Sequence, residues 1–101
     1  MDQLIVVIVN EGFDEDVMSA ARKAGARGGT ILSARGTAQE KDLIRSLGIF
    51  VHPNKDLILI LTDEGTRDPI MNAVKASAGL ATKGAGIIFS LPVDTIMGVN
   101  F

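Results

Sequence analysis

One stretch decides the fold: Gly25-Ala26-Arg27-Gly28-Gly29-Thr30-Ile31-Leu32-Ser33-Ala34-Arg35-Gly36-Thr37. From Thr30 to Arg35 the side chains alternate between two faces, which predicts a strand of a sheet that is covered on one side. Glycines enter and leave this strand, and a residue without a Cβ allows positive φ or close backbone approach. Backbone N–H groups at such glycines can lie beside a bound anion. The plainer interpretation is a tight helix-to-strand connection without a ligand.

Length and composition limit the classes of protein that fit. A chain of 101 residues supports one hydrophobic core, so we expect a single domain over residues 1–101. The formal net charge of −2 and the absence of Trp and Tyr argue against a nucleic-acid partner. The absence of cysteine excludes disulfides, thiolate metal sites and cysteine nucleophiles.

The amino-terminal residues lack the basic region of a signal peptide, and the apolar run Leu4–Val9 is too short to span a membrane. We therefore expect a cytoplasmic protein with no direct membrane insertion. Hydrophobic residues make up 47% of the chain, which predicts that part of its surface is buried between subunits.

Apolar runs and turn residues predict four strands and two main helices. The first helix has Asp14 as its N-cap and ends at Gly25. The second has Asp68 as its N-cap and Pro69 in its first helical position. A capping-box pattern that starts at Thr37 predicts a further short helix. The predicted strands are Leu4–Val9, Thr30–Arg35, Leu57–Leu61 and Ile87–Leu91, and the short helix covers residues 38–47.

This order of elements is typical of an α+β, ferredoxin-like βαββαβ sandwich, in which two helices cover one face of a four-stranded antiparallel sheet. Aliphatic residues on the other face of the sheet would then be exposed to water. Self-association would bury them, so we expect an oligomer.

Three segments carry a resemblance to a known family: Phe13–Val17, Gly28–Gly36, and Gly84-Ala85-Gly86-Ile87-Ile88-Phe89. Their order and spacing resemble the PII signal-transduction proteins, of the nitrogen regulatory P-II type. The resemblance covers nearly the whole chain. It implies a homotrimer that binds ATP, ADP or AMP in clefts between subunits. It also implies an effector loop, residues 37–55, that docks on a transporter or metabolic enzyme.

The resemblance also assigns candidate nucleotide-binding residues. The segment at Gly28 corresponds to the backbone that contacts the nucleotide, Gly36 begins the base of the effector loop, and Gly84 begins the phosphate-side segment. We expect a side chain introduced at Gly29 to block the ligand and to leave the oligomer folded. The full set is Gly28, Gly29, Thr30, Arg35, Gly36, Thr37, Ala38, Lys83, Gly84, Ala85, Gly86 and Ile87.

The chain departs from the family pattern at the phosphate side. Ala85 stands in the place of an acidic residue, and Ile87 in the place of a phosphate-binding lysine. Gly98-Val99-Asn100 replaces the arginines of the tail. We expect the loss of these cations to weaken triphosphate binding, unless Arg27, Arg35 or Lys83 compensates.

The favoured function is a non-catalytic PII-like regulator that senses a small effector and controls a protein partner, in nitrogen regulation or a related pathway. An enzyme on the same fold is disfavoured, because one histidine, His52, and no cysteine leave few catalytic groups. The alternative is a structural trimer of the CutA type, or a degenerate PII fold without nucleotide. A metal site would need more than one histidine or a convergent set of carboxylates.

Overall fold

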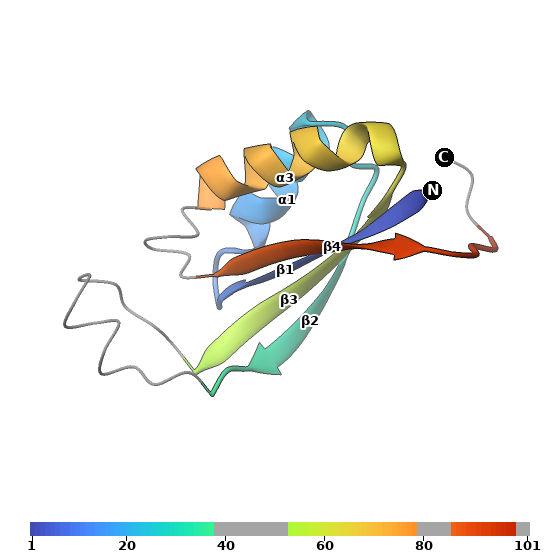
Figure 1. Ribbon diagram of the computed structural model, residues 1–101. Coiled ribbons are helices and arrows are strands. Elements are labelled where there is room, and N and C mark those ends of the chain that lie inside the picture. Colours follow the sequence, from blue (N-terminus) through green and yellow to red (C-terminus); the bar gives the residue numbers. More distant parts are fainter. Residues whose placement is uncertain (38–52, 79–85, 99–101) are drawn as a thin grey trace.

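The computed structural model describes residues 1–37, 53–78 and 86–98, and within them a sheet lies beneath two helices (Figure 1). The predicted short helix at 38–47 and His52 lie outside these residues. The strand over 30–35 has the predicted bounds, and the other strands extend beyond theirs by one to three residues at an end. The elements are β1 (Asp2–Asn10), α1 (Asp14–Lys23), β2 (Thr30–Arg35), β3 (Asn54–Thr62), α3 (Glu64–Ala78) and β4 (Ile87–Val93).

The strands form one sheet in the order β2-β3-β1-β4, and each neighbouring pair is antiparallel. This confirms the predicted α+β, ferredoxin-like βαββαβ arrangement. Strands β1 and β2 finish where β3 and β4 begin, and we call this edge of the sheet the loop end. The two edge strands, β2 and β4, lie on opposite sides of the central pair β1 and β3.

One face of the sheet packs against both helices. Alternate residues of the central strands point towards α1 and α3, because side chains alternate along a strand. Burying these aliphatic groups supplies most of the free energy of folding, at about 25 cal/mol per Å² of apolar surface. The core comprises Ile5, Val7, Val9, Val17, Met18, Ala21, Ala26, Ile58, Ile60, Ile70 and Val74.

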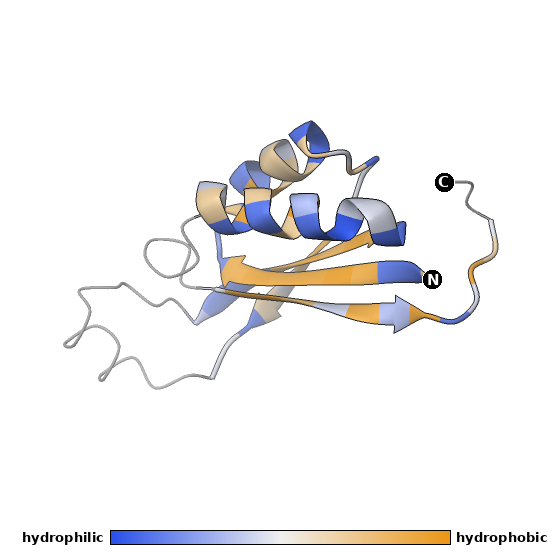
Figure 2. Cartoon of the chain, turned by 45° about the horizontal axis from the view of Figure 1, so that its top comes forward, coloured by the Kyte–Doolittle hydropathy of each residue, from blue (hydrophilic) through white to orange (hydrophobic). Residues whose placement is uncertain are grey.

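The other face, which we call the open face, carries neither of the described helices (Figure 2). It is also apolar. Pairing registers align its side chains in rows across the strands. Several of these side chains are large and exposed, notably Leu32, Phe89 and Leu91. The rows are Leu32-Leu57-Ile8-Ile87, Thr30-Leu59-Val6-Phe89 and Leu61-Leu4-Leu91.

Strand β2 is exposed along all six residues, contrary to the prediction that one of its faces is covered. The alternation itself is confirmed, because Ile31 pairs with buried Ile58 and Leu32 pairs with Leu57 of the open face. At the edge of the sheet, however, the helices do not reach over β2 in a single chain. Ile31 is therefore 46% exposed.

The carboxyl end of α1 forms a Schellman motif. Gly25 has a φ of +117°, as predicted for a helix end, and its N–H bonds to the carbonyl of Arg22 at 3.1 Å. The N–H of Ala26 bonds to the carbonyl of Ala21 at 2.9 Å. These two bonds satisfy carbonyls that the end of the helix would otherwise leave unpaired.

Two predicted helix starts were wrong. Phe13 occupies the N-cap position of α1 without a side-chain cap, and Asp14 is already helical. Helix α3 begins at Glu64 rather than after Asp68, because Asp63 accepts a hydrogen bond from the N–H of Thr66 at 2.9 Å and so caps the helix earlier. Pro69 therefore lies inside the helix.

Gly28 and Gly29 connect α1 to β2. The sequence predicted positive φ or close backbone approach at these glycines, and neither has positive φ. Close approach is confirmed at Gly29. A Cβ there would lie 2.8 Å from Sδ of Met18 and 3.2 Å from the carbonyl oxygen of Leu59. The absence of a side chain at Gly29 is therefore required by packing within one chain.

An exposed ion pair joins the first residue to the start of α3. The amino-terminal ammonium of Met1 lies 3.0 Å from Oε2 of Glu64. The hydrogen bond to this carboxylate, with its negative charge, raises the pKa of the ammonium above 8.0. The same contact lowers the pKa of Glu64 below 4.5.

Gly29→Ala is expected to lower the free energy of unfolding by about 1–3 kcal/mol, because the new methyl group must displace a buried sulfur and approach a fixed carbonyl. This corrects the expectation that a side chain at this position affects only a ligand. The matched control is Gly28→Ala, where a Cβ would meet no atom within 4 Å. Urea unfolding measures the free energy of unfolding of both variants. Equal values for Gly29→Ala and Gly28→Ala would contradict the packing role of Gly29.

The ion pair also predicts a pH dependence. The ammonium stabilises the fold below its unfolded pKa, and this contribution is lost as the pH rises through the raised folded value. Glu64 stabilises above its unfolded pKa, and its contribution is lost as the pH falls through the lowered folded value. In Glu64→Gln, NMR titration should show the ammonium pKa returning towards 8.0. An unchanged ammonium pKa in this variant would show that the pair does not form in solution.

Candidate ligand-binding site

At the loop end, the finish of β2 lies against the start of β3. The N–H of Gly36 bonds to the carbonyl of Pro53 at 2.6 Å and joins the two ends of the segment between them. The N–H of Glu11 bonds to the carbonyl of Asn54 at 3.1 Å. The base of the predicted effector loop is thus tied to β3, and β3 in turn to the turn after β1.

Lys55 is a buried cation at this end, and it is not among the predicted site residues. Its stem lies against Gly36, where a Cβ would be 2.9 Å from Cε of Lys55. Its Nζ donates to Oδ1 of Asn10 at 2.6 Å, and the two residues are 7% and 2% exposed. The sequence contains one indication of this role. Lys55 occupies the first of the alternate positions that continue with Leu57, Leu59 and Leu61 on the open face.

This hydrogen bond places the ammonium of Lys55, a residue of β3, beside β1. Lys55 pairs with Asn10, and Ile8 of β1 pairs with Ile87 of β4. Asn10 follows Ile8 by two residues, so it lies on the same face, one step nearer the loop end. The ammonium therefore approaches the start of β4, where the expected phosphate-side segment lies.

Gly86 packs tightly on β1. A Cβ at this position would collide with the carbonyl oxygen of Ile8 and would lie 2.9 Å from Cγ1 of Val9. Packing alone thus requires a glycine here. The next residue, Ile87, is 55% exposed on the open face, so this position offers a ligand an apolar surface and no charge.

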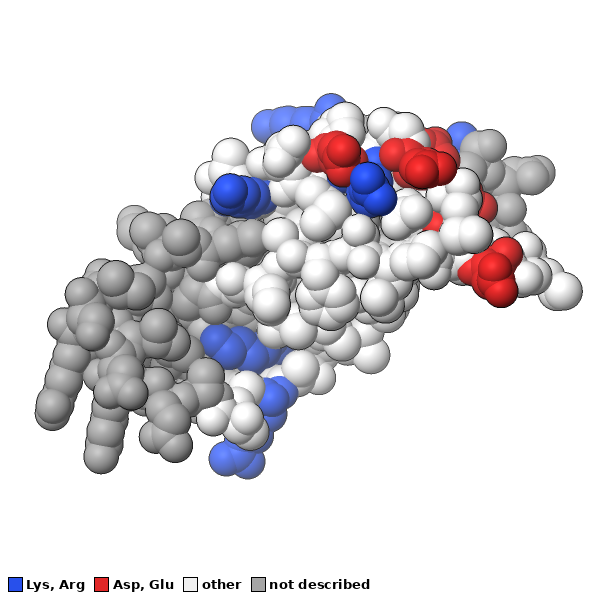
Figure 3. Space-filling view, viewed as in Figure 1, with Lys and Arg blue, Asp and Glu red and all other residues white. Residues whose placement is uncertain are grey.

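The remaining loop-end candidates, Arg35 and Thr37, are both exposed. Lys and Arg side chains lie beside the grey atoms at this end, whereas acidic side chains gather elsewhere (Figure 3). Four predicted site residues lie outside the described residues: Ala38, Lys83, Gly84 and Ala85.

Gly28, Gly29 and Thr30 line a hollow of about 480 Å³ at the other end of β2, which we call the glycine hollow. Three leucines supply its apolar part, and Arg27 supplies a positive charge. The hollow therefore combines accessible backbone, a hydrophobic surface and one cation. Its other lining residues are Arg27, Leu4, Leu59 and Leu61.

The candidate residues thus fall into two groups that one chain keeps apart. Gly36 lies beyond the finish of β2, and Gly29 lies before its start, so the length of the strand, about 17–20 Å, separates them. Ile87 lies on the opposite edge strand from Thr30, more than three strand spacings or about 14 Å away. A small ligand cannot contact both groups within one chain.

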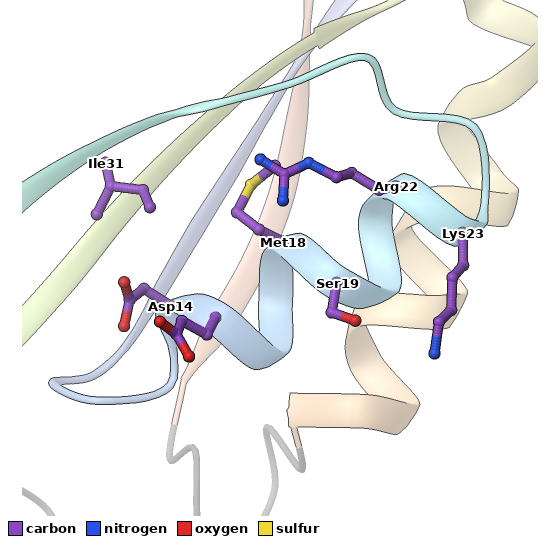
Figure 4. Close-up of a pocket in the computed structure, with 7 residues that line it drawn as sticks. Asp14, Met18, Ser19, Arg22, Lys23 and Ile31 are labelled. Carbon is purple, nitrogen blue, oxygen red and sulfur yellow. The ribbon is translucent and has the colours of Figure 1, made fainter.

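A second depression, the outer groove, runs between α1 and β2 on the helix side (Figure 4). Its volume is about 590 Å³. Along α1, Asp14 lies towards one end of the groove and Arg22 towards the other, with Met18 between them. Ile31 lines the groove from β2, across from the Asp14 end. None of the predicted site residues lines this groove.

Among the described residues, no group of three or more histidine, cysteine or carboxylate side chains could hold a metal ion. In the same ranges, no helix combines the length and the apolar character needed to cross a bilayer.

Comparisons with known proteins place this geometry in context. The sequence model of the family described as Nitrogen regulatory protein P-II matches residues 2–100. A crystal structure of Arabidopsis thaliana PII bound to citrate is similar to this chain, with a TM-score of 0.73 and 26% sequence identity. The similarity covers 97% of this chain and 80% of the Arabidopsis chain. A search of curated protein sequences found no match.

The family match spans nearly the whole sequence, and the observed strand order and helix placement agree with it. The chain therefore belongs to the nitrogen regulatory protein P-II family.

Proposed function

We propose that this protein is a non-catalytic regulator that binds a small anionic effector between the subunits of a homotrimer. The observation that carries the proposal is the separation of the candidate residues: Gly28–Thr30 lie where the edge strand β2 starts, whereas Gly86 and Ile87 lie at the loop end of the opposite edge strand, β4. A second copy that brings its β2 edge to the β4 edge of the first would place Gly28–Thr30 of one chain beside Gly86 and Ile87 of the other.

The open face supports the self-association. Its three rows of mostly aliphatic and aromatic side chains lie on the face of the sheet that neither of the described helices covers, and such a surface is unfavourable in water. A cyclic assembly of identical chains would bury these rows towards a common axis. A homotrimer is the assembly that membership in this family favours.

ATP, ADP or AMP are the effectors we propose. The glycine hollow offers apolar side chains to the adenine base. At the loop end Ile87 carries no charge, and Lys55 supplies the cation for the phosphate groups. Charge-assisted hydrogen bonds to phosphate oxygens are about twice as strong as neutral ones. The related Arabidopsis PII structure contains citrate, and an anionic effector agrees with that observation.

The loop over residues 37–55 is the proposed surface for a partner such as a transporter or metabolic enzyme, in the cytoplasm and in nitrogen regulation. A ligand influences such a loop only if it binds one conformation of the loop better than another. Gly36 supports this coupling, because it belongs to the candidate site and its N–H also bonds to Pro53 across the base of the loop.

Phe89→Asp is expected to dissociate the oligomer, because it places a charge in the middle row of the open face. The matched control, Ala76→Asp on the exposed side of α3, should leave the assembly intact. Light scattering over a dilution series measures both variants. A Phe89→Asp protein that keeps the size of the parent would contradict burial of this face.

Isothermal titration calorimetry against ATP, ADP, AMP and adenosine tests the ligand. We expect a dissociation constant of about micromolar for at least one nucleotide. Lys55→Met keeps the stem that packs on Gly36 and removes the ammonium, so nucleotide affinity should fall by about tenfold or more while adenosine binding is unchanged. The exposed Lys23→Met variant is the control.

Two results would count against this assignment. Equal losses for adenosine and for the nucleotides would show that Lys55 acts through packing alone. An intact oligomer that binds none of the four compounds would leave a P-II scaffold without nucleotide.

A further inference from the structure

The outer groove is a surface that neither the proposed ligand site nor the open face uses. It lies on the helix side of the sheet, between α1 and β2 (Figure 4). Ile31 lines it from β2 and is 46% exposed, although its pairing partner Ile58 is completely buried. Thr30 and Leu32, on either side of Ile31, belong to the opposite face of the strand, because side chains alternate along it. The groove therefore has an apolar wall that the described part of the chain leaves accessible.

The two ends of the groove carry opposite charges. Asp14 and Glu15 lie in the first turn of α1, and Arg22 and Lys23 lie in its last turn. The ends are about 12 Å apart, because a helix rises about 1.5 Å per residue. Within the described ranges, no hydrogen bond or ion pair engages any of these four side chains. Both pairs of charges are thus available to a binding partner.

The spacing of the layers indicates which secondary structure fits the groove. Packed helices lie about 8–10 Å apart, which is close to two strand spacings of about 4.8 Å. A third helix placed beside α1 at this distance would lie over β2 and cover Ile31. An extended peptide would instead pair with the edge of β2, which the proposed assembly gives to another copy. A helix is therefore the occupant that the groove favours.

We propose that the outer groove binds an amphipathic helix of a partner protein, antiparallel to α1. Acidic residues in the first turn and basic residues in the last turn favour any helix, because they complement its dipole. In the antiparallel orientation, the acidic first turn of the partner helix lies beside Arg22 and Lys23. Its basic last turn lies beside Asp14 and Glu15, and its apolar stripe covers Ile31. A parallel helix would bring like charges together at both ends.

This inference goes beyond the proposed function and does not depend on the nucleotide or on the homotrimer. It gives a regulated partner a second contact, separate from the proposed loop over residues 37–55. A partner that engages both surfaces gains affinity, because the second contact forms within a complex that already exists.

A synthetic helix tests the groove directly. The probe is a fluorescent peptide of about 18 residues with Glu in its first turn, Leu at i, i+3, i+4 and i+7, and Lys in its last turn. A control peptide exchanges the Glu and Lys residues, and a covalent staple on the polar face keeps both peptides helical. Fluorescence anisotropy should give a dissociation constant of about 10–100 μM for the probe and one at least about tenfold weaker for the control.

Variants of the protein locate the contact. Arg22→Glu should weaken binding of the probe by about tenfold and strengthen binding of the control peptide, because it reverses the charge at one end of the groove. The matched variant is Lys75→Glu, which makes the same change of charge in the last turn of α3, away from the groove. It should bind the probe within about twofold of the parent.

Alkylation of Ile31→Cys measures whether the groove is open, and the natural chain has no other cysteine. Iodoacetamide should modify this thiol rapidly in the free protein and slowly in the presence of the probe. Slow modification without the probe would overturn the inference, because part of the same chain or another copy would then already cover the groove. A rate that rises on dilution would identify the other copy as the cover.

Further outcomes separate the docking from the proposed function. Equal affinities for the two peptides, or an unchanged probe affinity in Arg22→Glu, would overturn the docking and leave the ligand and the oligomer as proposed. Probe binding as expected, in a protein that binds no nucleotide, would overturn the ligand assignment and support the docking.

Discussion

The structure depends on one constraint: the central strands β1 and β3 are apolar on both faces, and two helices cover only one of them. Ile5 and Ile58 illustrate the covered face, where they are completely buried. Val6 and Leu59 belong to the opposite face, where, among the described residues, edge strands and neighbouring side chains provide the shielding.

Polar groups interrupt this apolar sheet at the loop end, and each is satisfied locally. Lys55 bonds to Asn10, and Oδ2 of Asp56 accepts a hydrogen bond from the N–H of Gly12 at 3.2 Å. Burying polar groups is tolerable only when they have partners, so these contacts fix the relative positions of β1 and β3. The base of the loop is therefore held by specific bonds rather than by hydrophobic packing.

The architecture could be predicted from the sequence because the aliphatic runs and the alternation at Thr30–Arg35 are strong local signals. The helix starts were less accessible. Asp14 carries a suitable N-cap side chain, but Phe13 occupies that position without a side-chain cap. Asp63 and Asp68 are both suitable N-caps for α3, and the bond from the N–H of Thr66 to Asp63 starts the helix at the earlier one. The candidate site was harder still. Gly29 was interpreted as a ligand contact although Met18 already requires it, and the role of Lys55 depends on a partner 45 residues away.

The exposed open face has a consequence for how the protein exists at different concentrations. A chain that leaves Leu32, Phe89 and Leu91 accessible gains part of its stability only when another chain covers them. Its apparent melting temperature should then depend on dilution, and folding and assembly become one thermodynamic process. In the proposed homotrimer, contacts between chains would constrain the residues on this face as contacts within one chain constrain core residues, so changes there would need matching changes in the same sequence.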